Sequence, residues 1–515
     1  MKFFNTVGVT DPARHYFLPR RLDWEQLVGF IEKQYYFVLH APRQSGKTTA
    51  IIEFVKYLNK EGKYAALYLS TESARIAVND VNRALRAIIV QLKNQIPLFL
   101  DNQEYAIEYL ENLLKQEIQE SSIYDFLRFW SEKSTKPLTI FFDEFDVLAG
   151  DSLITLLTQL RTGYTNRPQY FPQSICLIGV RDLRDYKVKT TQEEELRVLY
   201  SPFNIKAESL LLPNFSQEDV KTLYLQHTAE TGQQFTDEAL AYAFQQTQGQ
   251  PWLVNALAYQ ACFRDVQDRT QTITKEVIER AQEALIARRD THLDALVDRL
   301  KEPRVRKIMD VIVSSSGQLE VFNQDDVQYV RDLGLIRQKD YVIANPIYQE
   351  IIPRTLLTGT QQGIIQESSW YQNPDGSLNM KKLLQAFTQF FRENSEVWLE
   401  RFDYKESGPH LLLMAFLQRV INGGGRIHRE YALGRKRVDL LVSWQKQRVV
   451  IELKILRGKD TLPDGLRQTA EYMDKSRTTE GHLVIFDRSP EKTWDEKIYH
   501  QKEFVDQRSI DVWGM

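Results

Sequence analysis

Residues 41–49 (APRQSGKTT) have types and a spacing that suit chemistry on a phosphate group. They follow a short apolar run, residues 35–40, and precede a helical pattern over residues 50–58. At such a junction, backbone N–H groups and the helix dipole can hold phosphates, while Lys47 reaches the outer phosphate oxygens and the Thr48 hydroxyl binds Mg²⁺. The residues expected to bind a nucleotide here are Gln44, Ser45, Gly46, Lys47, Thr48 and Thr49.

One position of this loop departs from the pattern G-x-x-x-x-G-K-[ST], because Ala41 stands where the first glycine is expected. An alanine there requires a negative φ or a mildly strained loop. The alternative interpretation is a chance Gly-Lys-Thr in a surface turn. The flanking strand and helix favour a phosphate-binding loop over that alternative.

A second stretch carries acids that suit the same chemistry. Residues 138–142 read as a buried strand that ends in Asp143 and Glu144. Ligands of open parallel sheets bind at the carboxyl ends of the strands, so this acid pair is expected beside the loop. We expect Asp143 to hold Mg²⁺ together with Thr48, and Glu144 to orient or deprotonate the attacking water. The alternative is that the two acids only cap the following helix.

Strands and helices alternate in the first 205 residues, which predicts a parallel sheet. Further helices are expected over residues 22–33, 78–93 and 104–129, and further strands over residues 64–69 and 174–180. From residue 212 the pattern is helical, with helices over residues 216–231 and 236–246 and a third that Gly249-Gln250-Pro251 opens.

Several arginines are candidates for a cation that contacts the transferred phosphate. Arg181, after the strand at residues 174–180, either senses the γ-phosphate or is a solvated loop charge, and both interpretations stay open. The other candidates are Arg161, Arg167, Arg288 and Arg289.

The loop, the acid pair and the helical lid with its Gly-x-Pro turn together resemble an AAA+/STAND-type ATPase of the archaeal and bacterial AAA-like group. The resemblance covers roughly residues 10–300. It implies ATP and Mg²⁺ as ligands, hydrolysis of ATP, and a lid that reports on the nucleotide. Relatives of this kind often form rings or oligomerise when triggered, so a homo-oligomer is also expected.

A predicted winged-helix module follows the lid. Residues 303–314 and 323–333 read as two short helices, and residues 334–337 and 341–346 as a hairpin. Its basic residues could contact DNA phosphates, but acidic residues offset them, so we favour a packing or regulatory role. The polar stretch from Thr358 to Asn379 then reads as a linker.

A second set of candidate catalytic residues lies on a predicted hairpin near the C-terminus. Asp439 is on its first strand, Glu452 and Lys454 are on its second, and a polar turn at residues 445–447 joins them. Period-two alternation places Glu452 and Lys454 on one face, where Asp439 can meet them. Two carboxylates suit an ion such as Mg²⁺, and the ammonium can position a water, so the expected chemistry is in-line hydrolysis of a phosphodiester.

A helix expected to begin at Gln468 places Gln468 and Tyr472 one turn apart on the same face. The order Asp, Glu-x-Lys, Gln-x-x-x-Tyr resembles the PD-(D/E)XK nuclease superfamily, particularly its RecB-like branch, over about residues 405–490. The resemblance implies that Asp439, Glu452 and Lys454 are catalytic and that Asp439 and Glu452 bind Mg²⁺ or Mn²⁺. It also implies that Gln468 and Tyr472 organise the substrate or the site.

One feature of that superfamily is missing. Many members add a glutamate from the first helix, whereas the helix expected over residues 408–420 contains no acid. Glu406 or Glu430 is the remaining candidate, and without either the site holds one metal instead of two.

The Glu452 and Lys454 pair, taken alone, is also typical of a solvated ion pair. Asp439 and the Gln468 helix favour the nuclease interpretation. The surrounding basic residues suit a nucleic-acid backbone, although they would equally form a solvated rim. They are Arg426, His428, Arg429, Arg435, Lys436, Arg437, Arg457, Lys459 and Arg467.

Composition sets the wider limits. The chain has 515 residues, of which 43% are hydrophobic, so it can bury several cores, and its net charge of −3 excludes a wholly basic nucleic-acid coat. Two cysteines, Cys176 and Cys262, exclude a disulfide framework and fit a reducing compartment. The sequence shows neither a signal peptide nor a membrane span, so we expect a cytoplasmic protein with no membrane partner.

The predicted fold class is α/β. We expect a phosphate-loop ATPase core in residues 1–205, a helical lid in 206–300, a winged-helix module in 301–357, a linker in 358–380 and a PD-(D/E)XK nuclease-like α/β domain in 381–515. The predicted function is an ATP-hydrolysing, Mg²⁺-dependent nuclease acting on DNA, in defence or repair. The alternative is a STAND-like signalling or scaffold ATPase whose nuclease fold binds nucleic acid without cutting it.

Overall fold

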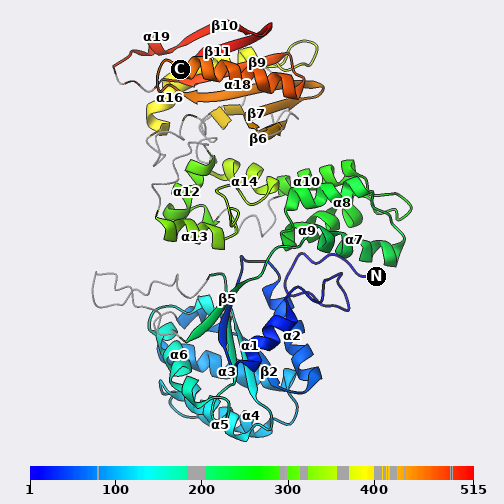
Figure 1. The fold of residues 1–515 in the computed structure, drawn as a ribbon, viewed down its shortest axis with the longest axis vertical. Coiled ribbons are helices and arrows are strands. Elements are labelled where there is room, and N and C mark those ends of the chain that lie inside the picture. Colours follow the sequence, from blue (N-terminus) through cyan, green and yellow to red (C-terminus); the bar gives the residue numbers. More distant parts are fainter. Residues whose placement is uncertain are drawn as a thin grey trace. The chain divides into compact units, whose positions relative to one another are not determined.

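A computed structural model describes the chain over residues 1–77, 80–181, 205–288, 296, 298–313, 323–356, 371–399, 409, 413–414, 416–417, 426–433, 436–487, 489 and 491–515. The chain divides into two units, Met1–Arg288 with Gln328–Ile336, and Arg289–Val327 with Arg337–Met515. Figure 1 labels their elements. No helix in these ranges is long and apolar enough to cross a membrane.

The first unit is organised on a five-stranded parallel sheet, in the order β2-β3-β4-β1-β5. Its strands are β1 (Tyr36–His40), β2 (Ala65–Ser70), β3 (Leu138–Asp143), β4 (Ser174–Gly179) and β5 (Lys206–Leu211). The first four are apolar and almost wholly buried because both faces of the sheet are covered. The predicted parallel sheet is therefore confirmed, while β5 is a strand that the sequence did not indicate.

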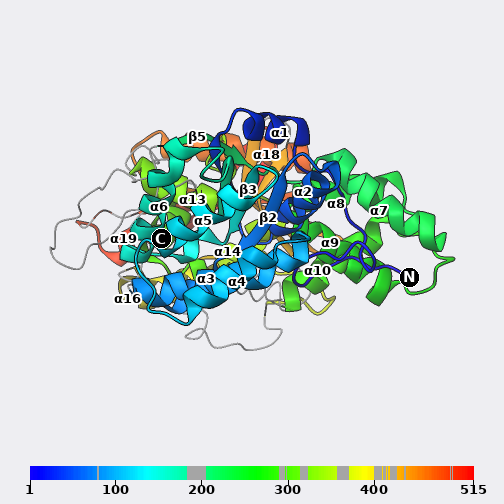
Figure 2. The ribbon, with the colours of Figure 1, turned by 90° about the horizontal axis from the view of Figure 1, so that it is seen from below.

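Helices cover both faces of this sheet. On one face, Phe54 of the helix after the loop packs with Phe141, and on the other face Leu85 packs with Phe142. Figure 2 shows the sheet between these two layers. The first layer contains α1 (Trp24–Glu32) and α2 (Lys47–Glu61), and the second contains α3 (Val81–Phe99), α4 (Glu104–Leu114), α5 (Ser122–Lys133) and α6 (Gly150–Gly163).

The single helix predicted over residues 104–129 is wrong, because α4 ends at Leu114 and α5 begins at Ser122. Between them the Gln119 N–H donates to the Ser122 hydroxyl at 2.9 Å. A serine side chain that bonds the local backbone in this way competes with helix continuation.

The region predicted as a helical lid belongs to the same unit, and its predicted helices are confirmed. It contains α7 (Gln217–Thr231), α8 (Asp237–Thr247), α9 (Pro251–Tyr259) and α10 (Lys275–Arg288). Ser216 and Asp219 form a capping box at the start of α7. Gly249, in the turn before α9, has φ +69°, and an added methyl group would lie 1.9 Å from the Phe215 carbonyl oxygen. The turn therefore requires a glycine at this position.

The region predicted as a winged-helix module contains α12 (Pro303–Val313), α13 (Gln324–Asp332) and α14 (Pro346–Leu356). The predicted hairpin is reduced to isolated bridge positions at Ile336 and Ile343 and to a hydrogen bond from the Arg337 N–H to the Val342 carbonyl at 2.9 Å, without a named strand among the described residues 334–345. The third helix follows because the Asn345 side chain accepts from the Tyr348 N–H at 2.9 Å and Pro346 occupies the first helical position. A winged-helix function stays a prediction.

The second unit is organised on a six-stranded mixed sheet, in the order β10-β11-β9-β8-β7-β6. Strands β6, β7 and β8 pair antiparallel, β8, β9 and β11 pair parallel, and β10 pairs antiparallel with β11. The strands are β6 (Arg426–Leu433), β7 (Lys436–Trp444), β8 (Gln447–Ile455), β9 (Glu480–Phe486), β10 (Tyr499–Val505) and β11 (Arg508–Gly514). Strand β9 is followed in this sheet by β11, which pairs with it and extends the sheet beyond it.

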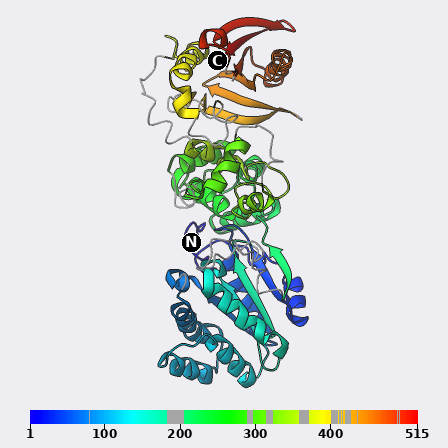
Figure 3. The ribbon, with the colours of Figure 1, turned by 90° about the vertical axis from the view of Figure 1, so that its left-hand side faces the viewer.

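Two helices cover opposite faces of this second sheet (Figure 3). On one face α18 (Thr461–Ser476) packs Tyr472 and Met473 against Leu483, and on the other α16 (Met380–Leu399) packs Phe391 against Phe486 at 5.4 Å. One prediction needs correction, because the helix expected to begin at Gln468 begins at Thr461. The helix predicted over residues 408–420 lies largely outside the described residues.

Part of the stretch predicted as a linker is folded against the second sheet. The Trp444 indole N–H donates to the Gly376 carbonyl at 2.9 Å. The Gln447 side chain bonds both the N–H and the carbonyl of Leu378, each at 3.0 Å. Residues 371–379 therefore pack on the hairpin that carries Asp439 and Glu452.

Candidate nucleotide and metal sites

The loop after β1 has the backbone shape of a phosphate cradle. Gln44 and Gly46 both adopt a left-handed conformation, with φ of 54° and 83°, and Gly46 is the N-cap of α2. Ala41 is fully buried, stays outside the left-handed region, and its N–H donates to the Gly179 carbonyl at 3.2 Å. Ala41 therefore fits with the negative φ that its side chain demands.

Lys47 is buried at the centre of this loop. Its Nζ donates to the carbonyl oxygens of Ala41 and Pro42, at 2.8 and 2.9 Å. Burial lowers the pKa of Lys47, while Asp143, Glu144 and Asp146 oppose this change. The ammonium is therefore held inside the loop, with three acids close enough to influence it.

Asp143 links the end of β3 to the start of α2. Its Oδ2 accepts a 2.6 Å hydrogen bond from the Thr48 hydroxyl and a 3.0 Å bond from the Tyr68 hydroxyl, and its Oδ1 accepts from the Glu144 N–H at 2.8 Å. The side chain is fully buried. The structure thus brings Thr48 and Asp143 together, and it adds Tyr68 of β2, which no motif indicated.

Glu144 has a left-handed backbone, with φ of 54°. The Thr71 hydroxyl donates to the Glu144 carbonyl at 2.9 Å and to the Asp143 carbonyl at 3.1 Å, which fixes this conformation. Burial, together with Asp143 and Asp146, raises the pKa of the Glu144 carboxyl. A glutamate with a raised pKa and a constrained backbone suits a general base.

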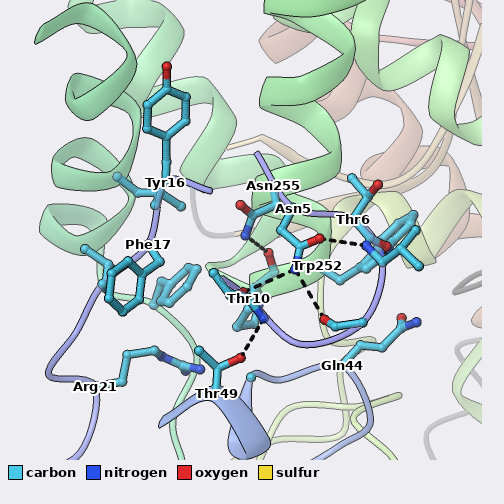
Figure 4. A pocket seen from close by; sticks show the side chains of 17 residues that line it. Asn5, Thr6, Thr10, Tyr16, Phe17, Arg21, Gln44, Thr49, Trp252 and Asn255 are labelled. Atoms are coloured by element: carbon cyan, nitrogen blue, oxygen red, sulfur yellow. Dashed lines mark hydrogen bonds between the residues drawn. The ribbon is translucent and has the colours of Figure 1, made fainter. Parts of the chain in front are cut away.

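A cavity of about 110 Å³ lies beside the loop, far above the ~10–15 Å³ that one water needs. The segment before α1 supplies Tyr16 and Phe17 to its wall, and α9 supplies Trp252 (Figure 4). Residues 5–10 also line it, because the Trp252 indole N–H donates to the Thr6 carbonyl at 2.9 Å and the Thr10 N–H donates to the Thr49 hydroxyl at 3.2 Å. This N-terminal stretch carries no motif and was not predicted.

The candidate arginines are not all near this site. Arg167 packs on the rings of Tyr36 and Tyr164 and donates to the Gln34 carbonyl, so it lies where β1 begins, at the opposite end from the loop. Arg181 lies over the Tyr329 ring, 4.6 Å from its centroid. Arg161 is in the last turn of α6. The side chains of Arg288 and Arg289 lie outside the described residues.

The second site forms where strands β7 and β8 separate. Their ladder is paired as far as Leu440 and Ile451, and one step further the Leu453 N–H donates to Asp439 Oδ2 at 2.9 Å. The carboxylate of Asp439 thus accepts a hydrogen bond from the backbone of β8. Glu452, on the neighbouring position of β8, bonds Lys454 through Oε1 and Nζ at 2.7 Å.

Glu452 is the least satisfied acid of this site. Its Oε2 is buried and has no hydrogen-bond partner among the described residues. Burial and the neighbouring Asp439 raise the pKa of Glu452 to about 7, and Lys454 opposes them. Burial and these two carboxylates also raise the pKa of Tyr472 to about 12, so the Tyr472 hydroxyl lies close to them.

These residues fit a divalent cation. An orphaned carboxylate oxygen beside a second carboxylate supplies the oxygen ligands that Mg²⁺ and Mn²⁺ prefer. Among the described residues no cluster of three or more His, Cys, Asp or Glu side chains is placed to hold a metal ion. The further acids considered, Glu406 and the side chain of Glu430, lie outside the described residues.

The remaining predicted residues of this site are Gln468 and a group of basic residues. Gln468 is on α18, one turn before Tyr472, and its side chain forms no hydrogen bond with the described part of the chain. Arg457 and Lys459 are exposed just after β8, and Arg467 pairs with Asp464 at 2.9 Å. The side chains of the basic residues in 426–437 are not among those described.

A parallel sheet whose loop after β1 presents Lys47 and Thr48 to the acid that ends β3 defines a P-loop nucleoside triphosphatase fold. The model of one family, described as an AAA-like domain, matches residues 8–351, which is most of the chain. This chain therefore belongs to the AAA-like family. Its family implies binding of ATP and Mg²⁺.

A second family model matches residues 380–489 and is described as a domain of unknown function, DUF8371. No curated protein matches the chain. The match of residues 380–489 confirms a separate C-terminal domain without assigning it an activity.

Solved structures with a similar chain course include the Walker-type ATPase PABY2304 of Pyrococcus abyssi, with a TM-score of 0.47 and 14% identity, over 68% of this chain and 99% of that one. Cdc6p from Pyrobaculum aerophilum has a TM-score of 0.37 and 11% identity, over 68% and 97% of the two chains. The Orc1 protein of Aeropyrum pernix, solved in complex with DNA, has a TM-score of 0.33 and 13% identity, over 67% and 94%. The family assignment rests on the family model.

Proposed function

We propose that this chain is an ATP-hydrolysing enzyme whose C-terminal domain is a metal-dependent nuclease acting on DNA. The observation that carries the first half is the 2.6 Å contact between Thr48 and Asp143, formed beside the buried ammonium of Lys47. It brings the two Mg²⁺-binding residue types of a P-loop triphosphatase to one point.

The residues of the first site have separate tasks in ATP hydrolysis. Lys47 exchanges its loop carbonyl partners for phosphate oxygens, and the N–H groups at the start of α2 face the same phosphates. A bound Mg²⁺ would neutralise charge on the phosphates, with Thr48 and Asp143 holding it. Glu144 accepts the proton of the attacking water, a role that its raised pKa favours.

The Lys47→Ala variant tests the nucleotide site. We expect it to lose most of its ATP affinity with an unchanged circular dichroism spectrum, because the substitution removes the phosphate contact and leaves α2 intact. Equilibrium binding of ATP, with Lys56→Ala as a control in the same helix, measures the difference. Wild-type ATP affinity in Lys47→Ala would contradict the assignment of the loop.

The second half is carried by the orphaned Oε2 of Glu452 beside Asp439. A buried carboxylate oxygen without a partner is costly, and a divalent cation would satisfy it. A bound Mg²⁺ or Mn²⁺ would act as a Lewis acid on the phosphodiester. Lys454, held at 2.7 Å from Glu452, positions the attacking water, and the nearby Tyr472 hydroxyl can donate to the substrate.

The assignment of DNA as substrate rests on the likeness of Asp439, Glu452 and Lys454 to RecB-like nucleases. The exposed Arg457 and Lys459, next to the strand that carries Glu452 and Lys454, are placed to meet a phosphate backbone.

The Lys454→Ala variant tests the cutting reaction. We expect metal-dependent cleavage to fall by at least about a hundredfold, because the group that positions the water is removed. The control is Lys492→Ala, since Lys492 pairs with Asp487 elsewhere in the same unit. If wild type binds DNA and divalent metal without cutting, the alternative of a signalling or scaffold ATPase with a non-cleaving domain is correct.

A further inference from the structure

The cavity beside the phosphate-binding loop contains a cation that no sequence motif identified. Arg21 lies just before α1 and lines this cavity with Gly46 and Thr49 (Figure 4). Its Nη1 donates to the Ser45 carbonyl of the loop, and its Nη2 donates to the Pro213 carbonyl at 2.6 Å. A methyl group placed on Gly46 would lie 2.7 Å from Nη1, so the guanidinium lies against the N-cap of α2.

Arg21 is half-buried, and its positive charge has no counter-charge paired with it among the described residues. It forms no ion pair with any residue that the structure describes, and the acid that acts on it, Asp219, is bonded to Ser216 at the cap of α7. Burial lowers the pKa of the Arg21 guanidinium to about 10. The helix dipole also opposes a cation at the N-terminus of α2, where Lys47 already adds one. An anion at this point would offset both the desolvation of the guanidinium and its repulsion by the helix dipole.

We propose that Arg21 binds a phosphate group that ADP and ATP share, separately from the phosphate contact of Lys47. This inference rests on the proposed binding of ATP. Lys47 contacts the carbonyls of Ala41 and Pro42, which do not line the cavity, whereas Arg21 lines it on the side of Thr49. Arg21 therefore meets the phosphate nearer the nucleoside. Its remaining N–H donors can contact that phosphate in a fork.

A purely structural role for Arg21 makes a different prediction. The side chain connects the loop at Ser45 with Pro213 and lies over the Phe215 ring, 4.5 Å from its centroid. If holding these segments together were its only task, removing it would destabilise the protein without nucleotide and leave phosphate binding largely intact. If it binds phosphate, removing an uncompensated charge spares the nucleotide-free protein.

The experiment measures the Kd of ADP and ATP, and the nucleotide-free melting temperature, for wild type, Arg21→Met, Arg21→Lys, Arg20→Met and Lys47→Ala. Methionine keeps the apolar stem of Arg21 without its charge. Arg20→Met is the matched control, because Arg20 is exposed and lies over the Trp24 ring at 4.8 Å. Arg21→Lys keeps the charge and loses the fork, and it also decides the question if Arg21→Met does not fold.

We expect Arg21→Met to weaken the binding of ADP and of ATP by the same factor, between about tenfold and a hundredfold. Its nucleotide-free melting temperature should be no lower than that of wild type. Arg21→Lys should lose less affinity, again by the same factor for ADP and ATP. Arg20→Met should bind both nucleotides as wild type does. Unchanged affinity with a lower melting temperature, or a loss confined to ATP, would overturn the inference. If wild type binds neither nucleotide, the proposed function itself fails. If Lys47→Ala loses nucleotide affinity and Arg21→Met keeps it, ATP binding stands and only the role of Arg21 is contradicted.

Discussion

Glu144, which is half-buried, and Glu452, which is buried, each have an aspartate as a neighbour, and in both cases desolvation and that neighbour raise the pKa of the glutamate. The chain places them differently. Glu144 is held through its backbone by Thr71, while Glu452 is held through its side chain by Lys454. In the proposed function, Glu144 therefore keeps its carboxylate for a water, and Glu452 offers one oxygen to a cation.

The Glu144→Gln variant should bind ATP within about threefold of wild type and hydrolyse it about 10²–10³ times more slowly, because an amide cannot accept the proton of the attacking water. Steady-state phosphate release and equilibrium binding on the same preparation give the two numbers. Glu132→Gln, at an exposed ion pair with Arg128 in the same unit, is the control. Normal turnover in Glu144→Gln would place the base at another residue.

The metal-free stability of the second unit should fall as pH rises toward 7, because of Glu452. Its folded pKa of about 7 lies above the ordinary value of 4.5, so the folded state binds this proton more tightly and is favoured at low pH. Between pH 5.5 and 7.0 the free energy of unfolding should fall by about 1.5 kcal/mol more in wild type than in Glu452→Gln.

Urea unfolding in EDTA at the two pH values measures this difference, with the wild-type and Glu452→Gln proteins compared at each pH. A gap between the two proteins that does not change with pH would show that Glu452 is ionised in the fold over the whole range.

At the scale of elements, the turn before α9 couples the lid to the cavity. The Phe215 N–H donates to the Gly249 carbonyl at 2.9 Å, and Phe215 also lines the cavity. A change in this turn can therefore reach the cavity through Phe215, and also through Pro251 and Trp252, which follow the turn and line the cavity.

Gly249→Ala should cost more than about 3 kcal/mol of stability, because its methyl group would lie 1.9 Å from the Phe215 carbonyl oxygen and φ is +69°. Gly232→Ala is the matched control: it also has a positive φ, of +82°, but its methyl group meets nothing within 4 Å, so only about 1–2 kcal/mol is expected. Chemical denaturation gives both values, and ATP affinity should fall only in Gly249→Ala. Equal costs in the two variants would contradict the packing argument.

The elements also show which parts of the site the sequence can predict. Lys47, Thr48 and Asp143 are identified because a local motif and a buried strand end fix their positions, and Glu452 and Lys454 because strands alternate with period two. Arg21, Tyr68 and residues 5–10 reach the site from separate segments, which no local pattern reports. Strand β10 was missed because its residues alternate between exposed and half-buried, without the apolar run that marks a core strand.

At the scale of the whole molecule, the two proposed sites draw their residues from different units of the chain. The proposed ATP site combines residues of the parallel sheet, of the helices after it and of the N-terminal segment, all in the first unit. The proposed metal site combines residues of β7, β8 and α18 in the second unit. Each site can therefore be inactivated without removing residues of the other, which separates the two halves of the proposed function.

The measurement that tests the account most directly is cleavage of single-stranded, linear double-stranded and circular double-stranded DNA, with and without Mg²⁺ or Mn²⁺ and ATP, by wild type, Asp439→Ala and Lys47→Ala. The account predicts metal-dependent cutting of at least one substrate by wild type and none by Asp439→Ala, which retains ATP hydrolysis. The response of Lys47→Ala shows whether nucleotide binding controls the cutting. An absence of cutting by wild type under every condition, or equal cutting by Asp439→Ala, would contradict the assignment of the second site.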